Sequence, residues 1–203
     1  MAKGGELWIG LTDFPIFLEA LILTFLIKKN GNADKKRWFT DFLMIAAGAL
    51  LGTIVHCVSL STAASRKIWV ILYVFPYSMV YLFFVLMIEK MKGGILPPAW
   101  FRAGVACYAV SCLLLMLGSD ADIFVFIGYA AVLAAAIVRE CIRQGRRAGR
   151  ENLVMILLGL AIVGQCLSIF IGSIGVIMGH ILVVTALFFL YEVAKEPASD
   201  RNV

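Results

Sequence analysis

The sequence has few charged residues: 15% of its 203 residues are Asp, Glu, Lys or Arg, whereas 62% are hydrophobic. A typical water-soluble domain is about half apolar and about a quarter charged. The mean hydropathy of +0.96 is more than one soluble core of this length can bury. The shortage of charge therefore excludes a soluble domain and predicts an all-α integral membrane protein, since helices can span a bilayer with their backbone groups satisfied.

Paired cysteines and a cleavable leader are also missing. The five cysteines are an odd number without a C-x-x-C pair, and a free cysteine in an apolar run usually acts as a small hydrophobe. Only Lys3 precedes the first apolar run, so we do not predict a signal peptide. The net charge of +5 does not indicate nucleic acid, because the basic residues separate hydrophobic runs, where they act as topology signals and contact anionic lipids.

Seven apolar runs are present, each close to the roughly 20 residues that a membrane-spanning helix needs. They cover residues 7–27, 38–60, 68–89, 98–117, 121–140, 152–171 and 173–194. We therefore predict one seven-helix transmembrane domain over residues 1–203, with membrane lipids as its partners. The division between the last two helices rests on the sequence "GSIG" at residues 172–175, because glycine and serine favour a turn.

Lysine and arginine are distributed unequally between alternate loops. If Arg102 and Arg139 at the adjoining helix ends are included, the loops after the first, third and fifth predicted helices carry 5, 3 and 5. The C-terminal tail carries 2, which leaves only 3 of the 18 on the other side. Basic residues are retained on the cytoplasmic side of a membrane. We therefore predict a multi-pass protein of the cell membrane with its N-terminus outside and its C-terminus in the cytoplasm.

Ionisable residues inside the predicted spans are the strongest functional signal, because each costs about 2.5–3.5 kcal/mol at the centre of a membrane helix. With a rise of about 1.5 Å per residue, Asp13 of the first helix, His56 of the second and His180 of the last reach the same outer-leaflet layer. The two histidines are the only ones in the chain. Two imidazoles and a carboxylate are the three ligands of many catalytic zinc sites, so the trio is a candidate zinc site.

Other polar residues are predicted to line a pocket around this trio. They are Tyr73, Tyr77, Ser111, Gln165, Ser168 and, at greater depth, Glu19. Isolated Tyr and Ser residues in membrane helices usually serve packing or bond to their own backbone, and the trio itself can be read as a structural clasp between helices. Glu19 lies about 120° around the helix from Asp13, so its role stays open.

Two functions fit this layer. One is a metal-dependent hydrolase for a lipid amide or ester, in which zinc would lower the pKa of a bound water to about 7. The other is a protein that binds or transports a small solute or lipid without catalysis, with His and Asp coupling binding to protons, since imidazole titrates near neutral pH. The residues alone leave both open.

The order of these features resembles the alkaline ceramidase and adiponectin-receptor (CREST) superfamily of seven-helix membrane proteins. The resemblance rests on an acidic residue early in the first helix and on His56 and His180, and it implies a zinc-dependent hydrolase-like fold. In that family the second helix carries S-x-x-x-H, the third an aspartate and the seventh H-x-x-x-H. This chain has "GTIVH" and "HILVV", with Gly52 and Val184 at two of these positions, and no aspartate in the predicted third helix.

Overall fold

The computed structural model describes residues 4–30, 35–58, 61–72 and 149–195, together with positions 106, 109–110, 112–114 and 116–118. The elements in the long ranges are α-helices, as predicted. They are α1 (Gly4–Asn30), α2 (Lys35–Cys57), α3 (Thr62–Leu72), α7 (Gly149–Ile171) and α8 (Ser173–Lys195). The helix predicted over 121–140, and most of those predicted over 68–89 and 98–117, lie outside the described residues.

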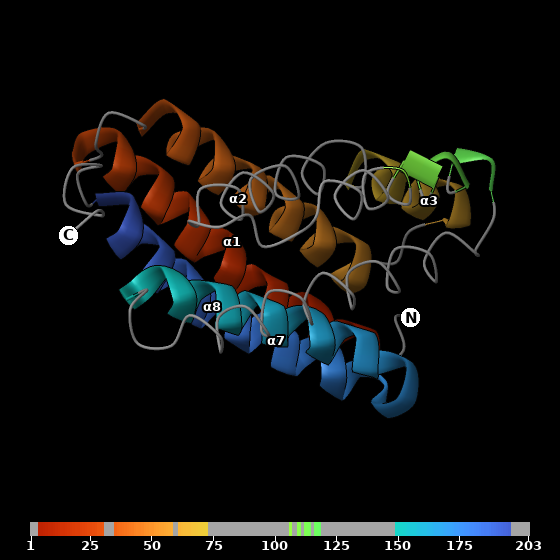
Figure 1. The fold of residues 1–203 in the computed structure, drawn as a ribbon. Coiled ribbons are helices and arrows are strands. Elements are labelled where there is room, and N and C mark those ends of the chain that lie inside the picture. Colours follow the sequence, from red (N-terminus) through yellow and green to blue (C-terminus); the bar gives the residue numbers. More distant parts are fainter. Residues whose placement is uncertain are drawn as a thin grey trace.

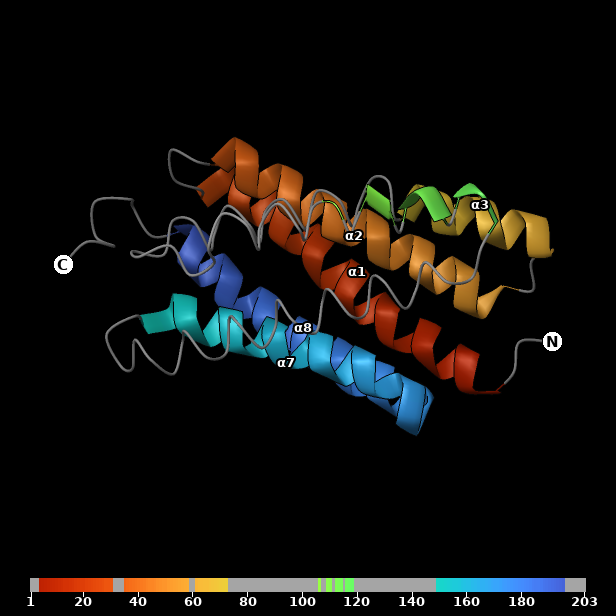
Figure 2. The same cartoon turned by 45° about the vertical axis from the view of Figure 1, so that its right-hand side comes forward.

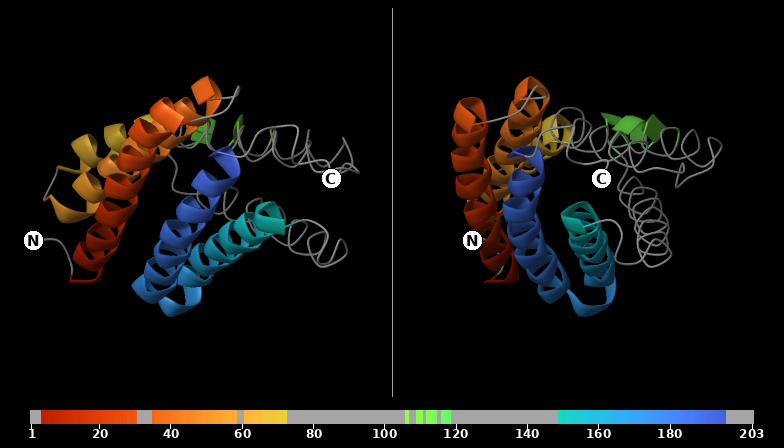
Figure 3. Two further views of the ribbon diagram at one scale, coloured as in Figure 1. Left: turned by 90° about the vertical axis from the view of Figure 1, so that its left-hand side faces the viewer. Right: turned by 60° about the vertical axis from the view of Figure 1, so that its left-hand side comes forward.

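Helix α1 lies between two neighbours, with α2 on one side and α8 on the other (Figure 1). Helix α7 packs against α8, and α3 contacts α2. Figures 1 and 2 show α1 and α8 running in the same direction, although they come from opposite ends of the sequence, while α2 and α7 run the opposite way. This parallel pairing brings the N-terminal half of α1 next to the N-terminal half of α8 (Figure 3).

Three of the described helices are long and apolar enough to cross a membrane, over Leu7–Lys29, Trp38–Cys57 and Ser173–Lys195. Their outward faces carry large apolar side chains: Phe25 is 64% exposed and Ile181 58%. Exposed apolar surface on this scale fits contact with lipid rather than with water. The chain is thus an all-helical protein compatible with a membrane, within the described residues.

The observed helix ends differ from the predicted ones, chiefly at α3. This helix begins at Thr62, six residues before the predicted start at residue 68. The Ser61 hydroxyl accepts a hydrogen bond from the backbone N–H of Ala64 at 3.2 Å, which is how a serine caps a helix start. The prediction began at Ile68, the first large apolar residue, and overlooked this cap because residues 62–67, "TAASRK", contain no large apolar side chain.

The break between α7 and α8 falls where the sequence predicts it. Only Gly172 separates the two helices, and its backbone has a φ of 64°. Its N–H donates to the carbonyl of Ser168 at 2.8 Å. Glycine adopts this left-handed conformation without steric cost, so one residue is enough to reverse the chain.

Large buried side chains fill one half of the bundle, toward the C-terminal ends of α1 and α8. We call this cluster the apolar half. It consists of Ile16, Ala20, Leu23, Ile27, Trp38, Phe42, Ala46, Ala49, Val154, Met155, Leu158, Ala186, Leu187, Leu190, Tyr191, Val193 and Ala194.

The opposite half is built around glycines, and we call the set Gly10, Gly52, Gly164, Gly175 and Gly179 the glycine half. A β-carbon on Gly175 would lie 2.6 Å from the carbonyl oxygen of Gly164. One on Gly179 would lie 2.9 Å from the carbonyl oxygen of Ala161. The α7 and α8 backbones therefore touch directly, as expected for small residues at membrane helix contacts.

Candidate functional site

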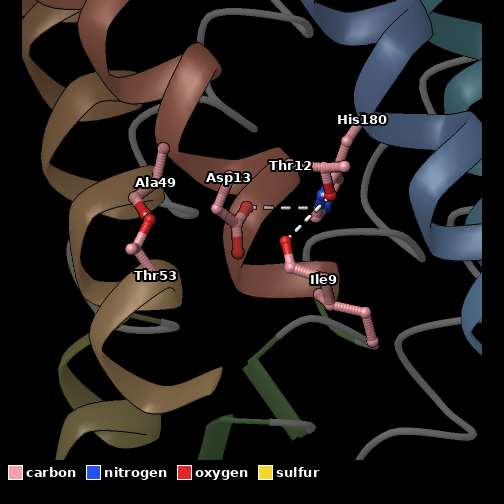
Figure 4. A network of polar contacts seen from close by, with 6 residues as sticks. All are labelled: Ile9, Thr12, Asp13, Ala49, Thr53 and His180. Carbon is pink, nitrogen blue, oxygen red and sulfur yellow. Dashed lines mark hydrogen bonds and ion pairs between the residues drawn. The ribbon is translucent and has the colours of Figure 1, made fainter. Parts of the chain in front are cut away.

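Asp13 lies in α1 between α2 and α8 and is only 8% exposed (Figure 4). On the α2 side it faces Gly52, where a β-carbon would lie 2.7 Å from the Asp13 Oδ2 atom. Any larger residue at position 52 would compete with the carboxylate for this space. The missing side chain of Gly52 therefore makes the room that Asp13 occupies.

His180 of α8 meets Asp13 from the other side (Figure 4). Its Nε2 lies 3.5 Å from Asp13 Oδ1, and its Nδ1 lies 2.8 Å from the Thr12 hydroxyl oxygen. Consecutive residues of an α-helix point about 100° apart, which lets Thr12 and Asp13 contact the two nitrogens of one imidazole. The ring is thus held in place by a single turn of α1.

The hydrogen bonds around Thr12 indicate which imidazole nitrogen carries a proton. The Thr12 hydroxyl donates to the carbonyl of Ile9 at 2.8 Å, so toward His180 its oxygen accepts, and Nδ1 is the donor. A single proton shared by Nε2 and Asp13 Oδ1 then makes the pair neutral overall. A neutral pair avoids the large cost of a net charge in apolar surroundings.

The second carboxylate oxygen of Asp13, Oδ2, lies against Gly52. Oδ2 makes no hydrogen bond to any residue in the described part of the chain. A carboxylate accepts hydrogen bonds at both oxygens, and one of them is committed to His180. The arrangement can therefore accept a hydrogen bond from an amine or hydroxyl group while the imidazole keeps the carboxylate oriented.

His56 lies one turn beyond Gly52 in α2, on the same side of the helix. A β-carbon on Gly10 of α1 would lie 3.1 Å from His56 Cβ, and the imidazole packs edge-on against Trp69 of α3, with ring centroids 5.8 Å apart. The structure thus places His56 in contact with α1 and α3, one helical turn from the glycine that faces Asp13.

The predicted zinc site needs three ligands, Asp13, His56 and His180. In the structure, two of them, Asp13 and His180, contact each other. Among the positions that the structure describes, no group of three or more His, Cys, Asp or Glu side chains is arranged to hold a metal ion. The donor set formed by Asp13 and His180 is therefore one ligand short of a zinc site. The zinc site stays a prediction, with His56 as its third member.

Gln165 and Ser168 of α7, predicted to line the pocket, lie where α7 crosses the glycines of α8. The Gln165 Cγ would be 3.1 Å from a β-carbon on Gly179, the residue before His180. The backbone nitrogen of Ser168 would be 2.8 Å from a β-carbon on Gly175. Gln165 thus packs against the residue before His180, and Ser168 contributes backbone packing; their place in a pocket stays a prediction.

Tyr73, Tyr77 and Ser111, the other residues predicted to line the pocket, lie outside the described residues. Glu19 is half-buried in α1, and its Oε2 atom is buried without a hydrogen-bond partner among the described residues.

Thr12 is the contact that sequence reasoning missed. Its hydroxyl orients His180, yet a threonine in a membrane helix usually bonds only to its own backbone, as Thr53 does with Ala49 at 2.9 Å. The available signal was its place directly before an intramembrane aspartate. Trp69 was missed as well, although it lies inside the predicted third helix, because its contact with His56 depends on how α2 and α3 pack.

Comparison with known proteins assigns the chain to a family whose activity is unknown. Residues 9–199 match the sequence profile of DUF6962, described as a family of unknown function. No curated protein and no solved structure matches the chain significantly. The matched range includes α1, α2, α3, α7 and α8 almost completely, with Asp13, His56 and His180. The chain therefore belongs to DUF6962, a family of unknown function.

Proposed function

We propose that this protein binds a polar ligand, a small solute or a lipid head group, at the Asp13–His180 pair between α1 and α8. The observation that carries the proposal is a buried carboxylate, 3.5 Å from an imidazole, in a helix apolar enough to span a membrane. Ionisable residues at such depth are expensive and mark functional sites more often than not.

The free acceptor on Asp13 supports a ligand that donates hydrogen bonds, such as an amine or a polyol. Thr12 holds the imidazole on its far side, so His180 can support the carboxylate while a ligand approaches Oδ2. Because imidazole titrates near neutral pH, binding at this pair is proposed to be coupled to protons.

The proposed setting is a seven-helix protein of the cell membrane with its N-terminus outside. The charge count supports this orientation. So does the shared end of the bundle at which α1 ends and α2 and α7 begin (Figures 1 and 2), because Lys28, Lys29, Lys35, Lys36 and Arg150 belong to these helix ends. A reporter fused after Val203 should be active in the cytoplasm, and one inserted after Gly118 only outside. Activity of both reporters in the same compartment would overturn the seven-helix topology.

A metal-dependent lipid hydrolase, the activity implied by the resemblance to the alkaline ceramidase and adiponectin-receptor superfamily, is the second candidate. One observation favours it: Nδ1 of His180 is already bonded to Thr12, and a zinc-bound histidine usually has its second nitrogen bonded in this way. The candidate requires a third ligand beside Asp13 and His180. Elemental analysis of the purified protein should then find about one zinc per chain, lost in both Asp13→Ala and His180→Ala.

Thermal unfolding in detergent tests the binding proposal. We would add ethanolamine, choline, glycerol and phosphatidylethanolamine to the wild type and to Asp13→Asn, His180→Gln and the control Thr53→Val. At least one compound should raise the melting temperature of the wild type and the control, but of neither site variant. If no compound does so, and both site variants simply melt earlier, the pair is a structural clasp and the proposal fails.

A further inference from the structure

Four lysines lie together where α1 ends and α2 begins. Lys28 and Lys29 occupy the last turn of α1, Lys35 and Lys36 begin α2, and all four side chains are exposed. Because α1 and α2 are adjacent and antiparallel (Figures 1 and 3), the two lysine pairs share one end of the bundle. We call these four residues the lysine patch.

The cations of α7 and α8 at the same end of the bundle are arranged differently. Arg150 and Lys195 both contact the carboxylate of Glu192, at 3.9 Å and 2.7 Å. These two cations therefore have an internal counter-ion, and their attraction for an external anion is reduced. Arg150 and Lys195 therefore serve as an internal comparison: cations at the same end of the bundle that have a counter-ion.

The lysine patch has no comparable counter-ion. None of its four lysines forms an ion pair with a residue that the structure describes. Residues 28–37, "KKNGNADKKR", contain five basic residues and one acidic residue, Asp34. An ion pair with Asp34 could therefore neutralise only one of the five, and a strong excess of positive charge remains.

The apolar surface beside the lysine patch indicates that the anion neutralising the lysines belongs to a lipid. Lys29 is the last residue of one apolar span and Trp38 the first of the next, which puts the lysines at the level of lipid head groups. Ile22 and Phe25, one to two turns before Lys29, are 57% and 64% exposed. Cationic groups next to exposed apolar side chains are complementary to a phosphate head group and its acyl chain.

We propose that the lysine patch binds the head group of an anionic phospholipid, with an acyl chain along Ile22 and Phe25 of α1. The charge excess selects an anionic lipid over a zwitterionic one. The adjoining apolar surface selects a lipid over free phosphate. The site lies at the far end of α1 from Asp13 and does not depend on the ligand proposed for that residue.

Native mass spectrometry of the full chain, with phosphatidylglycerol or phosphatidylcholine added to the detergent, tests this site. The wild type should retain phosphatidylglycerol in clear preference to phosphatidylcholine. Lys28→Gln/Lys29→Gln/Lys35→Gln/Lys36→Gln should reduce retention of phosphatidylglycerol about tenfold or more, because each lysine near an anionic surface contributes appreciably. The matched controls are Lys67→Gln in α3 and Lys195→Gln in α8, which should retain it like the wild type.

Melting temperatures supply a second measurement. Phosphatidylglycerol should stabilise the wild type, whereas inorganic phosphate at the same concentration should not. The four lysines are exposed, so the fourfold Lys→Gln variant should have the melting temperature of the wild type in phosphatidylcholine. If the fourfold variant does not fold, two double variants replace it: Lys28→Gln/Lys29→Gln and Lys35→Gln/Lys36→Gln. Unchanged lipid retention in the lysine variants, equal retention of the two lipids, or equal stabilisation by inorganic phosphate would overturn the proposal.

Discussion

The apolar half and the glycine half join helices in different ways. In the apolar half, large side chains such as Phe42 and Leu187 are fully buried and fill the space between helices. In the glycine half, α7 and α8 approach so closely that a β-carbon on Gly175 would lie 2.6 Å from a backbone oxygen. Lipid chains are as apolar as leucine, so both contacts rely on packing rather than on escape from water.

The two halves accommodate polar groups differently. In the glycine half, the missing side chain of Gly52 leaves room for the Asp13 carboxylate, which pairs with His180 of α8. Near the apolar half, the polar side chains of Asp41 and Asn152 are buried among large apolar ones. We therefore expect the apolar half to contribute mainly stability and the glycine half to position the Asp13–His180 pair.

The largest effect should come from adding a side chain where two backbones touch. Gly175→Leu cannot be accommodated without moving α7 away from α8, so it should cost about 3 kcal/mol or more. Met178→Leu, at a site that is 54% exposed, is the control and should be nearly neutral. Unfolding in detergent gives the comparison. A Gly175→Leu protein as stable as the control would mean that the backbones do not touch here.

A cavity in the apolar half should have the next largest effect. Phe42→Ala removes a ring of α2 that is fully buried in the apolar half. We expect a loss of about 2–3 kcal/mol, below the roughly 3–5 kcal/mol typical of soluble cores, because a lipid environment reduces the transfer term. Leu43→Ala, at the next and more exposed position, should cost much less. If Phe42→Ala and Leu43→Ala reduced the free energy of unfolding equally, the assignment of Phe42 to a packed apolar half would be wrong.

The Asp13–His180 pair should show a smaller, specific coupling. A double-mutant cycle with Asp13→Ala, His180→Ala and the double variant isolates their interaction from the effects of the single changes. We expect a coupling of about 1 kcal/mol, within the range measured for hydrogen bonds between membrane helices. Strictly additive losses would show that the two side chains do not interact.

The smallest effect should separate two threonines that look alike in the sequence. Thr12→Val removes a hydrogen bond to His180 on another helix, whereas Thr53→Val removes only a bond to the carbonyl of Ala49 in its own helix. Thr12→Val should lose about 0.6 kcal/mol and Thr53→Val almost nothing. The same unfolding assay measures both, and equal values would refute the assigned orientation of the imidazole.

Helix prediction was accurate where hydropathy changes sharply and less so where it does not. The break at Gly172 was predicted because glycine and serine interrupt an apolar stretch, and the structure shows one residue of turn there. The start of α3 was predicted too late because the Ser61 cap precedes a polar turn. Hydropathy detects the part of a helix that lies in lipid, whereas hydrogen bonding determines where the helix begins.

The sequence by itself determined that the chain is helical and apolar, and that Asp13 and His180 lie at a similar depth. These properties depend on composition and on the rise and rotation of a single helix. Only the tertiary structure decided that His180 is the partner of Asp13, while His56 packs against Trp69. It also decided that Thr12 bonds to a histidine 168 residues away. Helical periodicity specifies a depth and a direction, but which helices become neighbours depends on packing among all of them.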